Sequence, residues 1–462
     1  MKKLVYYFLG LALLVSACKK NDELTLPDNL VNFSVKTLGL GAEDDEAEVT
    51  LQLGRTAETE VKVELELLPG GVTYGTHFTT EPAAVNNKLT LTIPAGSTSA
   101  KFKVIKADGI LLNGDETINF TLKTVSGGSQ VVLGGDTELK LSFSSIVSEG
   151  AELTLQGGEG ASAAVNSVYV DLSANQQSSV VRKSWDLGFF SGADFRVRIN
   201  NTTAASAVMV DKTDINAVTA ADVDLDALAL GFGFGTLDVV DDTQGDLTKT
   251  VIGEVSATEG NNKVYVINRV ATGAAGVPAD LIKVRILRNG NDYTLQYAKL
   301  EETTFKTLTV QKSATANFTF VSFDTDGVVT VEPAKDRWDF VWGYSVYFTN
   351  FGTGLVPYAF SDLVFANHLG DVETAEVLTS TVSYDAFAEA NLSAVTLTKN
   401  RNTIGSGWRA TTGAVGVKAD RFYVIKDAAG NVYKLKFISF TTQDGGVRGY
   451  PKLQYALVKK GE

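Results

Sequence analysis

The sequence predicts an all-β protein, in which a β-sandwich is followed by two tandem antiparallel β domains. Short runs that alternate apolar and polar residues, such as 60–67 and 88–93, recur between turn residues throughout the chain. Valine, threonine and aromatic residues, which favour strands, are plentiful. A chain of 462 residues also has room for about three domains of ordinary size.

Composition excludes several classes of protein. The formal net charge of −13 argues against a nucleic-acid partner, because neutralising phosphates requires a basic surface. One cysteine and two histidines cannot supply a disulfide framework, a Cys-type zinc finger or C-x-x-C redox chemistry.

The N-terminus reads MKKLVYYFLGLALLVSAC, with two lysines, an apolar run and small residues before the only cysteine. The run is too short for a membrane-spanning helix, which needs about 20 residues. This pattern resembles the lipobox of bacterial lipoprotein signal peptides; an ordinary secretory signal with an incidental cysteine is the alternative. The resemblance implies a signal peptide over 1–17, a lipidated Cys18 and a polar leader over 18–29. The expected location is the bacterial outer membrane, anchored by lipid at the cell surface.

Residues 30–147 show closely spaced short strands, the pattern of a β-sandwich. The turn Gly75-x-x-Phe78, the turn at 94–96 and the run 114–116 before an apolar strand are similar to the Calx-beta family. Some members of that family bind calcium through acidic loop residues, whereas many are structural spacers. Carboxylates are suitable calcium ligands. The candidates here are Glu43, Asp44, Asp45, Asp108, Asp115 and Glu116.

The rest of the chain repeats itself. Trp185 matches Trp338 at an offset of 153 residues, and the runs 264–267 and 295–298 match 422–425 and 453–456 at an offset of 158. Matches that keep their order with small drifts indicate a duplication. The period is too long for a solenoid unit, so we expect two domains, over 150–302 and 303–460.

The two copies resemble the HmuY family of bacterial lipoproteins. The second copy carries the sequence RFYVIKDAAGNVYKLKF followed by Gly-Tyr-Pro and a closing strand, and the first carries an early Trp-Asp strand with a following Arg and Asn. The resemblance implies surface-exposed β domains. Its best-known members capture haem by axial ligation and pass it to an outer-membrane receptor, so haem and such a receptor are expected partners.

Haem needs an axial ligand, normally His, Met, Cys or Tyr. The first copy has one methionine, Met209, and no histidine, whereas the second has one histidine, His368, and no methionine. A pair of His or Met ligands within one copy is therefore impossible. Met209 and His368 remain candidate haem ligands, with a packed or loop side chain as the alternative.

The most aromatic passage is DRWDFVWGYSVYF, residues 336–348, in which Trp338, Phe340 and Trp342 alternate. An extended strand would place these side chains, together with those at 344, 346 and 348, on one face, and we expect that face to be a core. Tyr344 and Tyr347 are additions of the second copy and are the candidate ligand-binding residues of this strand.

Three functions remain open. The one favoured is a non-enzymatic surface protein that binds haem, another small planar or hydrophobic ligand, or a glycan. The second is a structural or adhesion lipoprotein. The third, an enzyme, finds no support, because the catalytic motifs HExxH, G-x-S-x-G and the P-loop are absent from the sequence.

Overall fold

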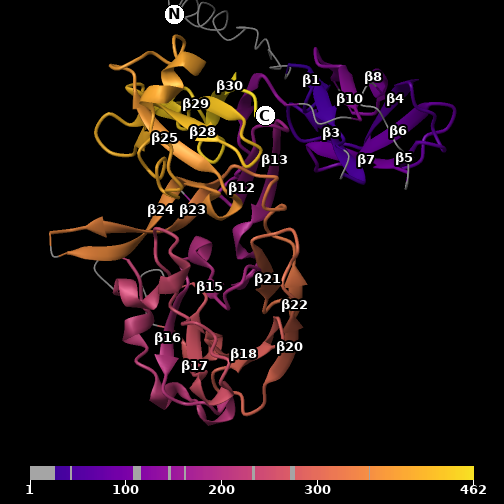
Figure 1. The fold of residues 1–462 in the computed structure, drawn as a ribbon. Helices are drawn as coiled ribbons and strands as arrows, with labels where there is room; N and C mark the ends of the chain where they lie inside the picture. The colour runs from indigo at the N-terminus through magenta and orange to yellow at the C-terminus, as the bar shows by residue number, and fades with distance from the viewer. Residues whose placement is uncertain are drawn as a thin grey trace, which may run out of the picture. The chain divides into compact units, whose positions relative to one another are not determined.

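The computed structural model describes residues 27–41, 44–107, 116–128, 130–143, 147–160, 163–231, 235–270, 276–352 and 354–461 (Figure 1). These residues form β-strands and short 3-10 helices, so the predicted all-β class is confirmed. The chain divides into two compact units, Met1–Ser145 and Ile146–Glu462. Among the residues described, no helix is long and apolar enough to cross a membrane.

The first unit is a two-sheet sandwich, as predicted. Along one strand, residues 61, 63, 65 and 67 are buried and the residues between them are exposed, which is the alternation of a strand with one face on a core. The first sheet has the order β5-β7-β3-β1-β9, with bounds β5 (Phe78–Glu81), β7 (Ser99–Lys106), β3 (Glu46–Leu53), β1 (Asn29–Phe33) and β9 (Val131–Leu133). The second has the order β2-β10-β8-β4-β6, with bounds β2 (Thr37–Gly39), β10 (Glu138–Ser142), β8 (Thr117–Ser126), β4 (Val61–Gly70) and β6 (Lys88–Ile93).

The second unit contains two lobes, each with two main sheets. Lobe 1 comprises the strands β14 to β22. Its larger sheet has the order β16-β17-β18-β19-β20, with bounds β16 (Ser206–Val210), β17 (Val264–Asn268), β18 (Ile282–Asn289), β19 (Asp292–Lys299) and β20 (Lys306–Val310). Its smaller sheet has the order β15-β14-β21-β22, with bounds β15 (Val197–Ile199), β14 (Leu187–Phe190), β21 (Phe318–Ser322) and β22 (Gly327–Val329).

Lobe 2 takes its strands from both ends of the unit. Its larger sheet has the order β11-β30-β29-β28-β25, with bounds β11 (Gly150–Thr154), β30 (Lys452–Lys459), β29 (Val432–Ser439), β28 (Arg421–Lys426) and β25 (Glu373–Leu378). Its smaller sheet has the order β13-β12-β23-β24, with bounds β13 (Gln176–Val181), β12 (Asn166–Asp171), β23 (Phe340–Asn350) and β24 (Leu355–Ala366). The short strands β26 (Arg409–Ala410) and β27 (Gly416–Val417) pair with each other.

The two lobes are built to the same plan. β16 to β19 in lobe 1 correspond to β25, β28, β29 and β30 in lobe 2, and the fifth position is filled by β20 in one lobe and by β11 in the other. In the smaller sheets, β14 and β15 correspond to β23 and β24, while β21 and β22 correspond to β12 and β13. The duplication read from the sequence is therefore repeated in the strand order.

Each sequence repeat nevertheless completes the lobe of the other. The first three strands of the first repeat, β11 to β13, pair in lobe 2, and the first three strands of the second repeat, β20 to β22, pair in lobe 1. The expected boundary between residues 302 and 303 consequently falls inside lobe 1 and does not separate two bodies. The reason is that strand pairing is a long-range contact, so repeat boundaries in a sequence do not specify which copy supplies a neighbouring strand.

The repeated Trp-Asp pair has the same structural role in both lobes. Asp186 accepts a hydrogen bond from the backbone N–H of Phe323 at 2.7 Å, and Asp339 accepts one from that of Leu172 at 2.7 Å. Each carboxylate thus fixes the end of a strand supplied by the other repeat.

The aromatic strand does not present one continuous face. Trp338 precedes β23, and a β-bulge between Gly343 and Ser345 shifts the register of β23 against β24. Phe340 and Trp342 lie in the core of lobe 2, whereas Trp338 packs in a separate cluster with Tyr169. The expectation of a single face therefore holds for Phe340 and Trp342 only. It was wrong for Trp338, which lies before the strand, and wrong beyond Trp342, because a bulge reverses the alternation of side chains.

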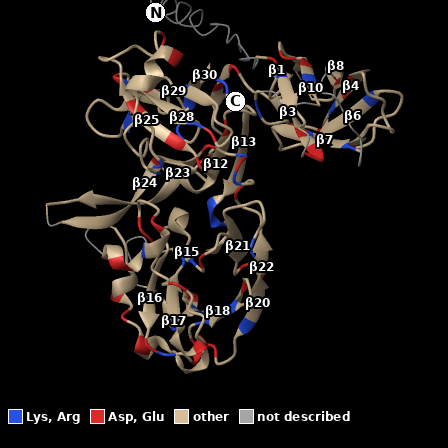
Figure 2. Ribbon diagram, in the orientation of Figure 1, with Lys and Arg blue, Asp and Glu red and all other residues tan. Residues whose placement is uncertain are grey.

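Short 3-10 helices connect the strands of the second unit. Their bounds are η1 (Arg182–Ser184), η2 (Asn201–Thr203), η3 (Ile215–Ala217), η4 (Ala220–Asp222), η5 (Asp226–Leu228), η6 (Leu237–Val239), η7 (Leu247–Lys249), η8 (Glu259–Asn261), η9 (Pro278–Asp280), η10 (His368–Gly370), η11 (Glu389–Ala394) and η12 (Thr442–Asp444). Acidic and basic residues are interspersed along the strands and loops of this unit (Figure 2).

Candidate functional site

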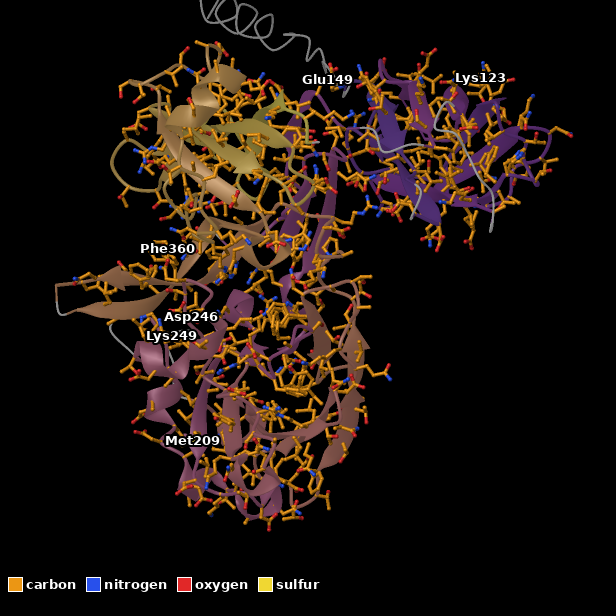
Figure 3. The ribbon with its side chains drawn as sticks, viewed as in Figure 1. Lys123, Glu149, Met209, Asp246, Lys249 and Phe360 are labelled. Carbon is orange, nitrogen blue, oxygen red and sulfur yellow. The ribbon has the colours of Figure 1, made fainter. Side chains whose placement is uncertain are left out.

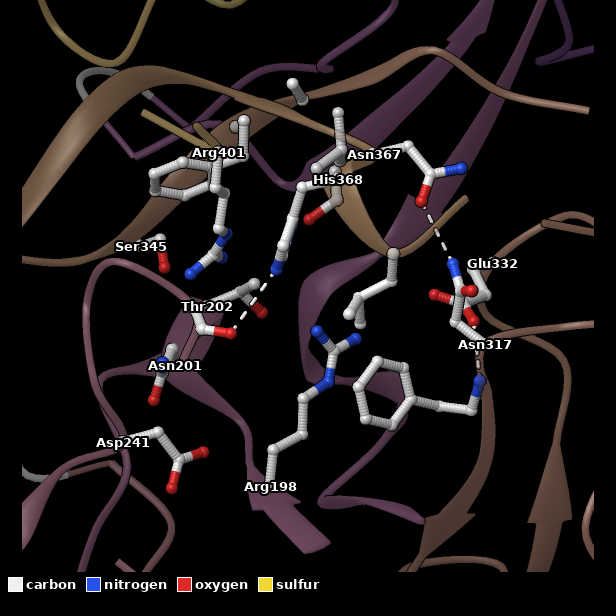
Figure 4. A pocket seen from close by; sticks show the side chains of 18 of the residues that line it. Arg198, Asn201, Thr202, Asp241, Asn317, Glu332, Ser345, Asn367, His368 and Arg401 are labelled. Atoms are coloured by element: carbon white, nitrogen blue, oxygen red, sulfur yellow. Dashed lines mark hydrogen bonds between the residues drawn. The ribbon is translucent and has the colours of Figure 1, made fainter. Parts of the chain in front are cut away.

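The second unit contains two hollows that share Tyr344 in their linings. The first, which we call the inner cavity, has a volume of about 90 Å³ and is lined by residues of both lobes (Figure 4). Much of its wall is aromatic, with Tyr169, Trp185, Phe318 and Trp338 among the lining residues. Two edge-to-face ring pairs support it: Trp185 with Phe320 at 4.9 Å and Tyr169 with Trp338 at 5.0 Å between ring centroids.

Arg198, on β15, brings a cation into this aromatic wall. Its guanidinium carbon lies 4.1 Å from the ring centroid of Phe318 and 5.3 Å from that of Trp185. Its Nε is buried and has no hydrogen-bond partner. Gly188 makes room for the side chain, since a Cβ at that position would lie 3.0 Å from this Nε.

Arg401 supplies a second cation from a loop of lobe 2. Its guanidinium carbon lies 4.0 Å from the ring centroid of Phe365, and Nη1 donates a long hydrogen bond of 3.4 Å to the carbonyl of Thr243. Burial and the neighbouring Arg198 lower the pKa of Arg401 to about 10.

His368 lies beside Arg401 in the cavity wall (Figure 4). Its Nε2 is 3.3 Å from the carbonyl oxygen of Gly245, to which the Nε2–H tautomer would donate. Burial, reinforced by Arg401, lowers the pKa of His368 to about 4, so the imidazole is neutral at pH 7. In lobe 1 the equivalent position is Asn201, whose buried Oδ1 has no hydrogen-bond partner.

Two buried carboxyls also line the inner cavity. Asp241 accepts hydrogen bonds from the backbone N–H groups of Ile199 at 2.8 Å and Val251 at 3.0 Å, and Glu332 accepts one from that of Phe318 at 2.7 Å. Burial raises the pKa of each carboxyl to about 7, although these hydrogen bonds and Arg198 act in the opposite direction. The cavity therefore contains carboxyls that titrate near neutral pH.

The second hollow, which we call the hairpin hollow, lies against β23 and β24 and has a volume of about 510 Å³. These two strands extend beyond the rest of lobe 2 as a two-stranded arm (Figure 1). The lining includes the rings of Tyr344, Tyr358 and Phe360, together with Val346. Tyr358 and Phe360 are in edge-to-face contact with a centroid distance of 5.1 Å.

Two guanidinium groups, from Arg409 and Arg448, also line the hairpin hollow. Both surround the buried Asp362: Arg448 Nη2 lies 2.6 Å and Arg409 Nε lies 3.9 Å from its Oδ2. One carboxylate thus faces two guanidinium groups, which leaves a surplus of positive charge beside the aromatic rings. Above Tyr344, Arg182 adds a cation–π contact of 4.7 Å.

The family model described as HmuY protein matches residues 163–455, more than half of the chain. This chain belongs to the HmuY family. The match spans strands of both lobes, so one HmuY domain corresponds to the whole exchanged pair of repeats. HmuY family membership indicates a ligand-binding surface protein of bacteria.

Likenesses to solved structures are weaker. The apo form of the Calx CBD1 domain is 22% identical, covering 25% of this chain and 96% of its own, with a TM-score of 0.22. A two-domain protein of unknown function from Bacteroides fragilis is 10% identical, covering 40% of this chain and 76% of its own, with a TM-score of 0.19. A putative carbohydrate binding protein from Bacteroides ovatus is 9% identical, covering 73% of this chain and 97% of its own, with a TM-score of 0.18. Among curated proteins nothing matches.

The candidate ligand residues lie in different places in the HmuY domain. His368 and Tyr344 both line the inner cavity, and Tyr344 also lines the hairpin hollow. Tyr347 stacks on Phe348, with a centroid distance of 4.6 Å, outside both linings. Met209 is 57% exposed on β16 in lobe 1 (Figure 3) and belongs to neither lining.

The lipidation candidate Cys18 lies outside the described residues. The same holds for three of the calcium candidates, Glu43, Asp108 and Asp115. Asp44 Oδ2 accepts a hydrogen bond from the backbone N–H of Gly41 at 2.8 Å, the geometry of a loop-closing side chain. Within the described ranges no group of three or more His, Cys, Asp or Glu residues could hold a metal ion.

Sequence reasoning missed the arginines of both hollows. Arg198, Arg401, Arg409 and Arg448 come from strands and loops that are far apart in the chain and carry no shared motif. The sequence analysis noted an Arg after the first Trp-Asp strand as part of the family pattern, but assigned it to no site.

Proposed function

We propose that this protein is a non-enzymatic, lipid-anchored protein of the outer-membrane surface that binds a flat, largely apolar ligand with acidic groups. Haem, or another planar molecule with carboxylates, suits this description. The observation that carries the proposal is the hairpin hollow, where aromatic rings and two arginines with a single buried carboxylate lie together.

Size favours the hairpin hollow over the inner cavity for such a ligand. Pockets for molecules of this class are about 300–1,000 Å³, a range that includes the 510 Å³ of the hairpin hollow but not the 90 Å³ of the inner cavity. Tyr344 and Tyr358 are the side chains in its lining that could ligate iron, through a phenolate oxygen. Burial raises the pKa of Tyr344, so ligation there would depend on the charge of the iron.

The alternatives from the sequence are a structural or adhesion role and glycan binding. A purely structural role would be favoured by the lack of any concave site, and the described residues include two hollows with polar and aromatic linings. An outer-membrane receptor that receives the ligand remains part of the proposal.

Titration of the full chain with haemin and with iron-free protoporphyrin tests the proposal. Both should bind, and Arg448→Gln should weaken both by at least about tenfold, because a charge-assisted contact contributes roughly 1.5–3 kcal/mol. Tyr344→Phe and Tyr358→Phe should change the Soret spectrum of haemin but leave protoporphyrin binding intact if either phenolate ligates iron.

His368→Ala and Met209→Ala are the matched controls, because neither residue lines the hairpin hollow. Loss of haem binding in either variant, or failure of both porphyrins to bind the parent protein, would contradict this placement.

The lipid anchor is tested separately. Cys18→Ser should abolish incorporation of labelled fatty acid and move the protein from the membrane fraction to the soluble fraction of expressing cells.

A further inference from the structure

The inner cavity contains two arginines that take no part in the binding proposed for the hairpin hollow. Arg198 and Arg401 both line it. Neither guanidinium lies within 4.0 Å of a carboxylate oxygen among the described residues, although Asp241, Asp242 and Glu332 interact with these charges from farther away. Both arginines are half-buried. A charge partly withdrawn from water without a directly paired partner is costly, so both guanidinium groups could still accept an anion.

The carboxyls of the cavity do not satisfy these arginines. The oxygens of Asp241 accept backbone hydrogen bonds from Ile199 and Val251, and Glu332 accepts one from Phe318. Asp242 accepts a hydrogen bond from the backbone of Asp246 at 3.0 Å. Asp246 is in turn paired with Lys249, at 3.0 Å.

We propose that the inner cavity is a second binding site, which takes a small monocarboxylate with an apolar body and holds its oxyanion with Arg198 and Arg401. A guanidinium group donates in a planar fork that matches the two oxygens of a carboxylate. Figure 4 shows both arginines, with His368 between them, directed into the same space from different elements.

The rest of the lining selects this ligand class. The aromatic wall formed by Trp185, Phe318 and Trp338 suits an apolar body. The carboxyls of the same cavity disfavour a dianion such as phosphate, because like charges in a poorly solvated site repel. Asn201 Oδ1 and Ser345 add polar groups that a hydroxyl-bearing ligand could use.

The size of the cavity limits the ligand. Since one water needs at least 10–15 Å³ measured in this way, a volume of about 90 Å³ has room for several waters or a small organic acid. A porphyrin is far too large. This site is therefore distinct from the one proposed for a planar ligand, and either proposal can fail without the other.

Benzoate, acetate and inorganic phosphate, each added to the porphyrin-free full chain, are the probes. Benzoate should bind saturably and raise the unfolding temperature more than acetate, and phosphate should bind least. Arg198→Gln and Arg401→Gln should each weaken benzoate binding at least about tenfold. Arg196→Gln is the matched control and should bind benzoate normally, because Arg196 is paired with Glu254 at 3.0 Å and does not line the cavity.

A second measurement keeps the test valid if an arginine variant fails to fold. Trp185 lines the cavity, so benzoate should change the tryptophan fluorescence of the parent protein, and Trp185→Phe should reduce the amplitude of that change. No benzoate binding, tighter binding of phosphate than of benzoate, or an unchanged amplitude in Trp185→Phe would each overturn the proposal.

Discussion

At the scale of single residues, the inner cavity concentrates groups whose charge depends on their burial. Asp241 and Glu332 are acids with raised pKa values, and His368 is a base with a lowered one. Near neutral pH the two acids are therefore partly protonated, whereas free carboxyls would be ionised, and the imidazole of His368 is neutral. The free energy of unfolding therefore depends on pH through these three groups.

Glu332 gives a pH prediction. Its pKa rises from 4.5 to about 7 on folding, so its contribution to stability is present below pH 4.5 and is lost as the pH rises through 7. Glu332→Gln keeps a side-chain oxygen for the N–H of Phe318 but cannot ionise. The variant should match the parent near pH 4 and be more stable at pH 8, by up to about 3 kcal/mol at roughly 1.4 kcal/mol per pKa unit.

Denaturant unfolding of both proteins at each pH measures this difference. The opposite effect of His368, whose stability contribution is lost as pH falls from 6.5 to 4, cancels in the comparison. A constant difference between parent and variant from pH 4 to 8 would contradict the raised pKa.

Gly245 gives a second prediction at this scale. Its φ is +84°, and a Cβ there would lie 2.8 Å from Arg401 Cδ and 2.9 Å from His368 Cε1. Gly245→Ala should destabilise the protein by roughly 2–4 kcal/mol, from backbone strain of about 1–2 kcal/mol and displacement of two half-buried side chains. Gly290→Ala is the control, because its φ is +61° and nothing lies within 4 Å of the added Cβ. Equal costs in thermal unfolding would show that the contacts do not matter.

At the scale of elements, β23 combines a core strand with an exposed arm. Trp342 is fully buried and Phe351, just beyond the strand, is 56% exposed. The β-bulge at Gly343 marks the change from one role to the other. Gly157 is required opposite Trp342, since a Cβ there would lie 2.2 Å from the indole ring.

Trp342→Ala and Tyr347→Ala test this division of the strand. Trp342→Ala should destabilise by about 3–5 kcal/mol, the usual cost of deleting a buried aromatic ring. Tyr347 is only half-buried on the arm, so Tyr347→Ala should cost clearly less. Urea unfolding followed by circular dichroism measures both; similar losses would mean that the arm is as much a part of the core as the base of the strand.

At the scale of the whole molecule, the exchange of strands makes lobe 2, but not lobe 1, depend on pairing between the two ends of the second unit. β14 to β22 are contiguous in the chain and complete lobe 1, whereas lobe 2 closes only when β11, near the start, pairs with β30, near the end. Lobe 2 has the same strand order as lobe 1, but its strands follow one another along the chain in a circularly permuted order. Such long-range closure costs more chain entropy than local pairing.

Two fragments distinguish this arrangement from a simple tandem. Residues 182–335 retain every strand of lobe 1 and should unfold cooperatively. Residues 150–302, the sequence repeat, lack β20 to β22 and keep β11 to β13 without their partners, so they should not. Thermal unfolding followed by circular dichroism compares the two, and cooperative unfolding of 150–302 alone would contradict the exchanged pairing.

The sequence alone determined the elements and the duplication. Alternating residues specify which segments are strands and which of their faces are buried, because that periodicity is local, and the repeated Trp-Asp pair at 185 and 338 marks equivalent strands. Tertiary structure alone decided which repeat completes which lobe, and where Arg198, Glu332 and Arg401 meet. The physical reason is that strand partners and cavity linings are contacts between distant segments, and a charged residue on a strand shows its environment only after the chain has folded around it.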